Sequence, residues 1–503
     1  MNALLIFPEF PDTFWSFKHA LRFLRKKSGH QPLGLITVAA LLPEGWGKRL
    51  VDTNVTPLSQ ADLEWADLAL ISAMNVQRDS AAALIARCRE AGVTVVAGGP
   101  LFTAEPEHFE QVDHFVLNEA ELTLPAFLRD LEAGCAQRVY RTEEFADLRH
   151  SPTPLWDLVD LRHYASMGIQ YSRGCPYACE FCNVTTLFGH RPRTKTAAQI
   201  VADLEHLYDR GWRRAVFVVD DNFIGNRQAL KRELLPALIQ WRRGRRGMPF
   251  NTEVSINLVD DAELMAMMVA AGFKTVFVGI ETPDDGALRE CNKYHNRNRD
   301  LVACVKRIQR AGLEVQGGFI VGFDSDTPSI FQRQIDFIQR SGIVTAMVSL
   351  LQAPHGTRLY ERLKREGRLR WEMYGDNTDG STNVIPRMTL KTLREGHREV
   401  LAQIYAPRNY YARIRTFLKE YKPPRFAAHH DLRDVLALCR SVYHLGIAGR
   451  ERRQYWSLVA STLLVRPRSF AVAIRLAIYG FHFRRVCELL SGPRTPAARS
   501  RAR

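Results

Sequence analysis

The sequence contains no long run of hydrophobic residues. A membrane-spanning helix needs roughly 18 or more apolar residues in succession, and no such stretch occurs, although 46% of the 503 residues are hydrophobic. The chain starts with an apolar segment, but no basic residue precedes it, and Pro8 and Glu9 soon follow. This start predicts a first β-strand and not a secretory signal peptide. The composition is that of a globular protein with roughly two to four domains.

Cysteine is scarce, with nine residues in the whole chain. Without a signal peptide, such usage predicts a reducing compartment, and we expect a cytoplasmic protein. Six cysteines are scattered, mostly in apolar, helix-like settings, and are interpreted as small buried hydrophobic residues. These are Cys88, Cys135, Cys291, Cys304, Cys439 and Cys487. The other three lie close together and need a different explanation.

The basic excess is confined to one end of the chain. The formal net charge is +15, and the residues from Leu401 onward contain 20 Lys and Arg against 5 Asp and Glu. A nucleic-acid-binding enzyme would often show its basic excess elsewhere too, and no RNA-binding module is visible. Nucleic acid is therefore not an expected partner.

Residues 1–140 alternate between strand and helix patterns, which predicts an α/β domain of the Rossmann-like kind with a parallel, doubly wound sheet. Residues 141–165 are interpreted as a linker, because they contain Pro152-Thr153-Pro154 and show little periodicity. The predicted strands of the first domain are 3–7, 49–52, 68–72, 94–97 and 114–117.

A second alternation covers residues 166–370 and predicts a partial (β/α)6 barrel of the TIM type. Its strands are expected at 168–171, 215–219, 250–256, 275–280, 314–321 and 344–350. Residues 371–491 show only helical patterns and predict an α-helical C-terminal domain. Residues 492–503 are rich in Pro, Ala and Arg and predict a disordered tail.

Cys175, Cys179 and Cys182 follow the first predicted barrel strand with the spacing C-x-x-x-C-x-x-C, and Phe181 precedes the last of them. Four thiolates would saturate a 4Fe–4S cluster, whereas three leave one iron open, and an open iron can chelate the amino and carboxylate groups of S-adenosylmethionine (SAM). The alternative is a zinc site with His190 as fourth ligand. Zinc sites usually use paired C-x-x-C units, and no second pair is present.

On this motif, and across the whole barrel, the sequence resembles the radical SAM superfamily. The resemblance implies that SAM is cleaved at the cluster to a carbon radical, with electrons from a donor such as flavodoxin or ferredoxin. It also implies SAM-binding positions at the ends of successive strands, although Asp221 stands in a segment that departs from the common Gly-Gly-Glu version. Those positions are Phe181, Asp221, Asn222, Glu253, Ser255, Asn257, Glu281, Gly318 and Ile320.

The first domain is similar to cobalamin-binding Rossmann-like domains. The residues that carry this resemblance, and that it implies as cobalamin-binding, are Ser72, Met74, Gly98, Gly99, Pro100, Asn118 and Glu119. Glycines at 98 and 99 would let the backbone approach the nucleotide tail of the cofactor. The D-x-H-x-x-G loop is lacking, so the resemblance implies cobalamin without histidine ligation, and His19 is interpreted as a surface or packing residue. The alternative is a degenerate domain that binds nothing.

The domain order resembles the group of cobalamin-dependent radical SAM enzymes that contains the bacterial hopanoid methylases. The resemblance implies methyl transfer to an unactivated carbon of a lipid, isoprenoid or other small molecule, with one SAM methylating cobalamin and another supplying the radical. One alternative is oxidation or ring rearrangement without methyl transfer. Another is a cobalamin-binding sensor, against which the intact cysteine triplet argues.

Two apolar stretches near the C-terminus, residues 455–465 and 469–483, are bordered by Arg466, Arg484 and Arg485. Apolar faces with arginine borders are typical of helices that lie in a membrane interface. They are equally typical of a core helix pair that caps the barrel. The sequence leaves both interpretations open.

Overall fold

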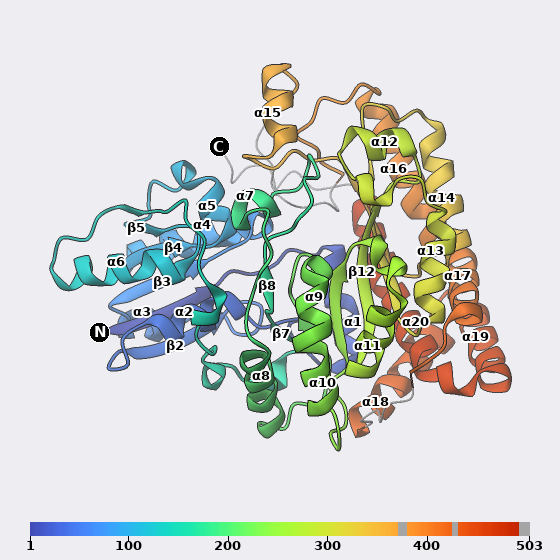
Figure 1. The fold of residues 1–503 in the computed structure, drawn as a ribbon, viewed down its shortest axis with the longest axis horizontal. Coiled ribbons are helices and arrows are strands. Elements are labelled where there is room, and N and C mark those ends of the chain that lie inside the picture. Colours follow the sequence, from blue (N-terminus) through green and yellow to red (C-terminus); the bar gives the residue numbers. More distant parts are fainter. Residues whose placement is uncertain (371–379, 425–430, 492–503) are drawn as a thin grey trace.

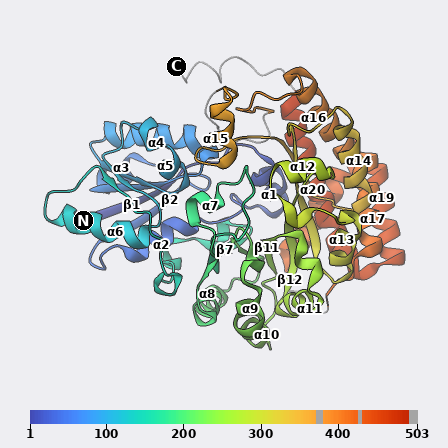
Figure 2. The ribbon, with the colours of Figure 1, turned by 45° about the horizontal axis from the view of Figure 1, so that its top comes forward.

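The computed structural model describes residues 1–370, 380–424 and 431–491. The predicted disordered tail, residues 492–503, lies outside the described residues. Figure 1 shows three layers of the chain side by side, with an N-terminal sheet in blue and cyan, a barrel in green and yellow, and C-terminal helices in orange and red. Figure 2 shows the same order after rotation. The predicted α/β fold class, with its helical C-terminal region, is confirmed.

The N-terminal sheet has six parallel strands in the order β2-β1-β3-β4-β5-β6. Alternate side chains pack on opposite faces, one against α4 (Arg78–Glu90) and the other against α2 (Leu33–Leu41) and α6 (Ala120–Glu132). The strand missed by sequence reasoning is the two-residue edge strand β6. The strands are β1 (Asn2–Phe7), β2 (Gly47–Asp52), β3 (Leu68–Ser72), β4 (Thr94–Gly98), β5 (His114–Val116) and β6 (Val139–Tyr140).

The barrel sheet also has six parallel strands, in the order β14-β13-β12-β11-β10-β7, so that β7 and β14 form its two edges. All six were predicted. They are β7 (Met167–Ile169), β10 (Val216–Val218), β11 (Phe250–Val254), β12 (Phe273–Glu281), β13 (Glu314–Val321) and β14 (Ala346–Leu350). The helix between β10 and β11 is interrupted by a π-turn at Leu230–Leu234, because Pro236 at the start of α10 (Leu235–Trp241) cannot donate a helical hydrogen bond.

The two faces of the barrel sheet differ in exposure. Along β11, β12 and β13, buried residues alternate with partly exposed ones. The buried set, which includes Val276 and Val278, packs in one core cluster with residues of α11 (Ala262–Ala271) and α13 (Leu301–Arg310). The partly exposed set, which includes Glu253, Phe277 and Gly318, therefore lies on the inner face of the barrel.

The C-terminal helices belong to the main core. They pack on the β14 edge of the barrel: the Tyr405 hydroxyl donates to the Ala346 carbonyl, and Arg413, which is fully buried, donates to the Val344 carbonyl. The longest of them, α20 (Phe470–Ser491), packs against α1 (Lys18–Leu24), and Nε2 of His482 lies 3.1 Å from the Phe14 carbonyl oxygen. The helices are α16 (Leu390–Tyr405), α17 (Pro407–Glu420), α18 (Leu432–Ser441), α19 (Arg452–Val465) and α20 (Phe470–Ser491).

This packing decides between the two interpretations of residues 469–483. Leu476, Ala477 and Phe483 have no exposed surface, so the apolar content of this stretch is core and not a membrane-facing side. None of the helices in the described ranges is long and apolar enough to cross a membrane. His19 lies with its ring 5.6 Å from that of His482, as a packing residue would.

Candidate functional site

The three clustered cysteines lie on a loop that leaves the carboxyl end of the barrel. A short antiparallel hairpin, β8 (Ser172–Arg173) and β9 (Arg193–Thr194), forms its base. Gly174 closes the neck, because its φ is +94° and a Cβ there would lie 2.8 Å from the Arg191 carbonyl oxygen. The loop therefore presents Cys175, Cys179 and Cys182 from a fixed base, and all three remain partly accessible.

Burial raises the pKa of all three thiols, that of Cys182 to about 12. Thiols with raised pKa values stay protonated at neutral pH, so the bound metal itself must stabilise the thiolate form that ligates it. In the described part of the chain, no three His, Cys, Asp or Glu side chains converge on one metal-ion position, so the zinc alternative with His190, which is exposed, gains no support. A cubane cluster binds each thiolate through a different iron, which suits three thiols spread along a loop.

Two adjacent aspartates after β10 have different surroundings. Asp220 is fully buried and accepts hydrogen bonds from the backbone N–H groups of Tyr171 and Ser172, each at 2.8 Å, and from the Ser172 hydroxyl at 2.6 Å. It therefore anchors the start of the cysteine loop, a role that sequence reasoning missed. Asp221 retains accessible surface, and the surrounding protein raises its pKa to about 6.

Polar side chains from neighbouring strand ends connect to the cysteine loop. The Asn222 amide nitrogen lies 3.9 Å from the Cys175 sulfur, and its Oδ1 accepts from the Ser255 backbone N–H at 3.3 Å. The Ser255 hydroxyl donates to Asn257 Oδ1 at 2.7 Å, and the Asn257 amide donates to the Tyr177 hydroxyl at 2.7 Å. The structure thus brings together three of the predicted SAM-binding residues, and adds Tyr177.

An ion pair lies beside this network. Lys293 Nζ is 2.6 Å from Glu281 Oε1 and 5.9 Å from the centre of the Phe181 ring. Glu281 has a φ of +64° at the end of β12, which turns its carboxylate toward Lys293. Burial and the Asp221 charge raise the pKa of Glu253 to about 8. The cationic parts of SAM would stabilise the ionised forms of Asp221 and Glu253.

The remaining two predicted SAM-binding residues lie on the inner face of β13. A Cβ at Gly318 would approach the Phe277 ring to 2.9 Å, so glycine is needed there to admit that ring. Ile320 is partly exposed on the same face. Sequence reasoning missed Lys293 because it stands twelve positions after Glu281 in an irregular segment with no motif to mark it.

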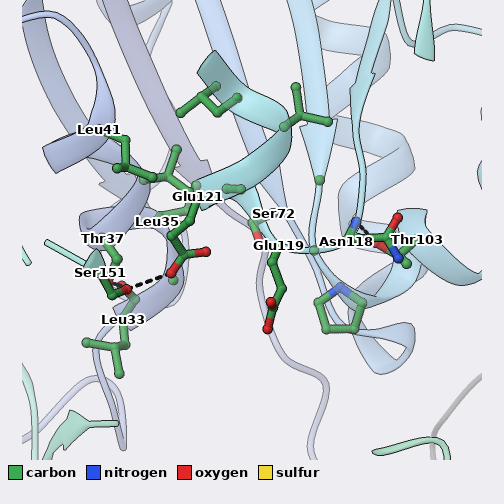
Figure 3. A pocket seen from close by; sticks show the side chains of 18 of the residues that line it. Leu33, Leu35, Thr37, Leu41, Ser72, Thr103, Asn118, Glu119, Glu121 and Ser151 are labelled. Atoms are coloured by element: carbon green, nitrogen blue, oxygen red, sulfur yellow. Dashed lines mark hydrogen bonds between the residues drawn. The ribbon is translucent and has the colours of Figure 1, made fainter. Parts of the chain in front are cut away.

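An open cavity separates the N-terminal sheet from the cysteine loop. Its one wall consists of α2 and the carboxyl ends of β3 and β4, where open parallel sheets bind ligands (Figure 3). The other wall includes Gln170, Arg173 and Val219 of the barrel. Six predicted cobalamin-binding residues line it, namely Ser72, Gly98, Gly99, Pro100, Asn118 and Glu119. Met74 is not among the lining residues, and its side chain is 50% exposed.

The two glycines at this cavity have a reason within the protein itself. A Cβ at Gly99, whose φ is +88°, would lie 2.5 Å from the Ser72 hydroxyl, and one at Gly98 would lie 2.6 Å from the Val116 carbonyl oxygen. A side chain at Gly98 would therefore displace the end of β5, and one at Gly99 would displace the Ser72 hydroxyl and strain the backbone, whether or not a cofactor approaches.

Charged residues join the two walls of the cavity. Arg193 binds both oxygens of Glu119 at 2.8 Å, and Arg173 binds Glu121 at 2.8 and 3.1 Å. Burial opposes ionisation of Glu121, but Arg173 outweighs it and lowers the pKa to about 2. The Glu-x-Glu turn of the N-terminal sheet thus holds the hairpin that carries the cysteine loop. Sequence reasoning assigned Glu119 to cobalamin and did not foresee these ion pairs between domains.

Comparison with known proteins agrees with this arrangement. Residues 25–128 match the B12 binding domain, residues 169–338 the radical SAM superfamily and residues 357–494 a domain of unknown function, DUF4070. The chain is 39% identical to an uncharacterized methyltransferase of Synechocystis sp., over 97% of this chain and 92% of that protein. It is 32% identical to the hopanoid C-2 methylase of Rhodopseudomonas palustris, over 92% and 89% of the two chains.

The chain belongs to the cobalamin-dependent radical SAM methyltransferases. Its fold is also that of the cobalamin-dependent radical SAM enzyme OxsB (TM-score 0.62, 13% identity, 97% of this chain and 79% of that chain). A second structure with this fold is the radical SAM methyltransferase TsrM of Kitasatospora setae with cobalamin and a [4Fe-4S] cluster bound (TM-score 0.59, 14% identity, 98% and 100%). The cofactors of this methyltransferase are a 4Fe–4S cluster, SAM and cobalamin, and its substrate is a small molecule.

Proposed function

We propose that the enzyme transfers a methyl group to an unactivated carbon of a polycyclic isoprenoid lipid. The observation that carries this proposal is that the cavity at the predicted cobalamin-binding residues and the predicted SAM-binding residues share one strand end. Val219 lines the cavity, and Asp221, two residues further along the same strand end, is among the predicted SAM-binding residues. The hopanoid methylase named above supports the substrate class, because it matches this chain over nearly its whole length.

When bound, the cluster and SAM supply a radical that removes hydrogen from carbon, and cobalamin supplies the methyl group. The protein's own contribution is to hold these regions together and to exclude water. Gln31 fixes the N-terminal domain on β7, since its amide donates to the Gly168 carbonyl and accepts from the Gly168 N–H, both at 2.8 Å. Arg173 and Arg193 hold the cysteine loop against Glu121 and Glu119.

Lipid profiling of a deletion strain fed methyl-labelled methionine tests this function. We expect the deletion to remove one or more isoprenoid lipids that carry a labelled methyl group, with accumulation of the lipid lighter by that group. A deletion strain with an unchanged methylated lipid profile would contradict the substrate class. Accumulation of a lipid that differs by hydrogen content alone would indicate oxidation or ring rearrangement instead.

We infer also that the enzyme works at the cytoplasmic face of a membrane, with electrons from a flavodoxin- or ferredoxin-type donor. Support comes from an exposed apolar stripe on the helix formed by α18 and the π-turn Val442–Ile447 that continues it. Its members recur at helical spacing, and Leu432 and Ile447 are 72% and 59% exposed. The stripe consists of Leu432, Val435, Leu436, Tyr443 and Ile447.

Neighbouring groups favour an anionic lipid surface as the partner of this stripe. Trp456 donates to the Gly446 carbonyl at 3.0 Å, which places an exposed indole beside Ile447. Arg450, Arg452 and Arg453 are exposed on the segment that follows. Each basic residue near an anionic surface contributes about 1 kcal/mol, and the apolar stripe adds a part that salt does not screen.

The full-length enzyme should therefore sediment with vesicles that contain phosphatidylglycerol, and high salt should weaken this binding without abolishing it. Replacing Val435 and Ile447 together by Asp should lower vesicle binding at least tenfold. Leu122→Asp, a partly exposed apolar position on α6, is the matched control and should leave it unchanged. If the unaltered enzyme, the double variant and the Leu122→Asp control sediment equally with the vesicles, the membrane contact is contradicted. It is also contradicted if the unaltered enzyme does not sediment with them.

A further inference from the structure

Two side chains of the N-terminal domain reach the barrel strands. Trp15 lies in the turn Phe14–Ser16 after β1, and its ring centre is 4.9 Å from that of Phe277 in β12. His30 lies between α1 and α2, and its ring centre is 5.3 Å from that of Phe217 in β10. These contacts at two strands show that the N-terminal domain packs on the barrel strands as well as on the cysteine loop.

Both contacts are made on the inner face. The Phe277 ring lies over Gly318, where a Cβ would approach it to 2.9 Å, and both residues alternate with buried, helix-facing neighbours. Phe217 alternates in the same way with the buried Val216 and Val218. Trp15 and His30 therefore face the interior of the barrel from the side of the cobalamin-binding domain.

The positions of the two side chains are fixed by buried neighbours. Phe14, 1% exposed, packs against Tyr405 and Phe483, which holds the turn that carries Trp15. The Gln31 hydrogen bonds to Gly168 hold the segment that carries His30. Yet Trp15 remains 45% exposed and His30 is also exposed. A rigidly held, accessible tryptophan is typical of a contact surface for a ligand.

This inner face has no cationic side chain at its inward strand positions. Burial and the Asp221 charge raise the pKa of Glu253 to about 8, so most of this carboxyl is protonated while SAM is absent. The inward positions of β10 to β13 (217, 251, 253, 275, 277, 316 and 318) include no Lys or Arg. Aromatic carbon and neutral hydrogen-bonding groups remain, which suits an apolar ligand and disfavours an ionic one.

The aromatic layer lies close to the predicted SAM-binding groups. Phe277 pairs with Glu253, and Ser255 and Gly279 stand two residues further along the same strands. Two residues of a strand span about 7 Å. A ligand on Trp15 and Phe277 would thus lie next to the strand ends that carry the polar network.

We propose that Trp15 and His30 are substrate-contacting residues, and that the substrate presents an uncharged, ring-containing hydrocarbon surface to them. The proposal rests on the proposed function and adds which residues select the substrate. Trp15 stacks on the hydrocarbon surface with Phe277, and His30 offers its hydrogen bond to a hydroxyl or water at the rim of the same surface.

Steady-state methylation of a hopanoid hydrocarbon in detergent micelles tests this proposal. Trp15→Ala should raise the apparent KM at least tenfold, whereas Trp15→Phe should restore most of the affinity. Iron content, cobalamin content and SAM cleavage without substrate should stay at the level of the unaltered enzyme. Val139→Ala is the matched control, because Val139 is equally exposed, at 45%, but lies on the edge strand β6 of the N-terminal sheet, away from the barrel.

The outcomes separate this proposal from the proposed function. If the unaltered enzyme makes no methylated hopanoid while it cleaves SAM, the proposed lipid substrate is wrong. If the unaltered enzyme is active and Trp15→Ala keeps its KM, the assignment of Trp15 is wrong. A carboxylated hopanoid that is methylated with the same KM as the hydrocarbon would overturn the preference for an uncharged surface.

Discussion

Replacing Cys175, Cys179 and Cys182 together by Ala will abolish the iron–sulfur cluster and all reductive cleavage of SAM. The triplet supplies all three predicted thiolate ligands of the cluster, so the variant keeps none of them. The unaltered enzyme, reconstituted without oxygen, should bind about four irons and four sulfides and form 5′-deoxyadenosine when reduced. Iron analysis and mass spectrometry of the nucleoside product measure both effects.

Cobalamin binding should survive in this variant, because none of the three cysteines lines the cavity between the N-terminal sheet and the barrel. A variant with Cys135→Ala and Cys439→Ala, which removes two exposed thiols elsewhere, is the control and should keep cluster and activity. A triple variant that still holds four irons and cleaves SAM would show that these cysteines are not the cluster ligands.

Truncation after Glu451 is the second large effect, and we expect it to yield insoluble protein. It removes α19 and α20, and with them Tyr455, Leu458, Leu476 and Phe483, each without exposed surface. It also leaves the buried Glu314 carboxylate without Arg475. Loss of one large buried apolar side chain costs about 2 to 5 kcal/mol, and whole domains are stable by only about 5 to 15 kcal/mol, so the remaining core cannot tolerate this loss.

A milder change keeps this prediction measurable in soluble protein. Phe483→Ala should lower the free energy of unfolding by about 3 to 5 kcal/mol, seen as a lower Tm. Leu464→Ala, at a position 84% exposed at the end of α19, should change it by less than about 0.5 kcal/mol. A soluble truncated protein with both cofactors bound would mean that these helices are dispensable for the barrel.

Much of the fold could be predicted because strand and helix periods are visible along the chain. Apolar runs such as those of β3, β4 and β12 face helices on a parallel sheet, and such runs are readable without knowledge of their neighbours. The hairpin β8 and β9 has two residues in each strand, too few for any period. It exists because Gly174 closes the loop between them.

The candidate site was predictable where spacing marks chemistry and unpredictable where only topology brings groups together. The cysteine triplet has a local signature, and the strand-end residues follow from the order of the strands. Asp220 and Asp221 are identical neighbours, and only the burial of Asp220 under Tyr171 and Ser172 separates an anchor from an accessible carboxylate. Lys293, Trp15 and His30 arrive from irregular segments, whose course no local pattern predicts.

The apolar stretches of the C-terminal helices show the same limit of prediction from local sequence. Residues 469–483 and the exposed stripe on 432–447 both have apolar residues at helical spacing. One is covered by α1, α16 and α17, whereas the described residues leave the exposed members of the other uncovered. Hydrophobic periodicity identifies a face, but the element that packs on it is a property of the whole fold.

Methyl transfer is tested most directly by an anaerobic assay of the full-length, reconstituted enzyme with trideuteromethyl SAM, a reductant and hopanoid extract. We expect a lipid product heavier by one trideuteromethyl group in place of hydrogen, together with 5′-deoxyadenosine. The labelled lipid should not form when either cobalamin or the cysteine triplet is missing, and 5′-deoxyadenosine should not form when the triplet is missing. Formation of 5′-deoxyadenosine with a lipid product that never carries deuterium would contradict methyl transfer.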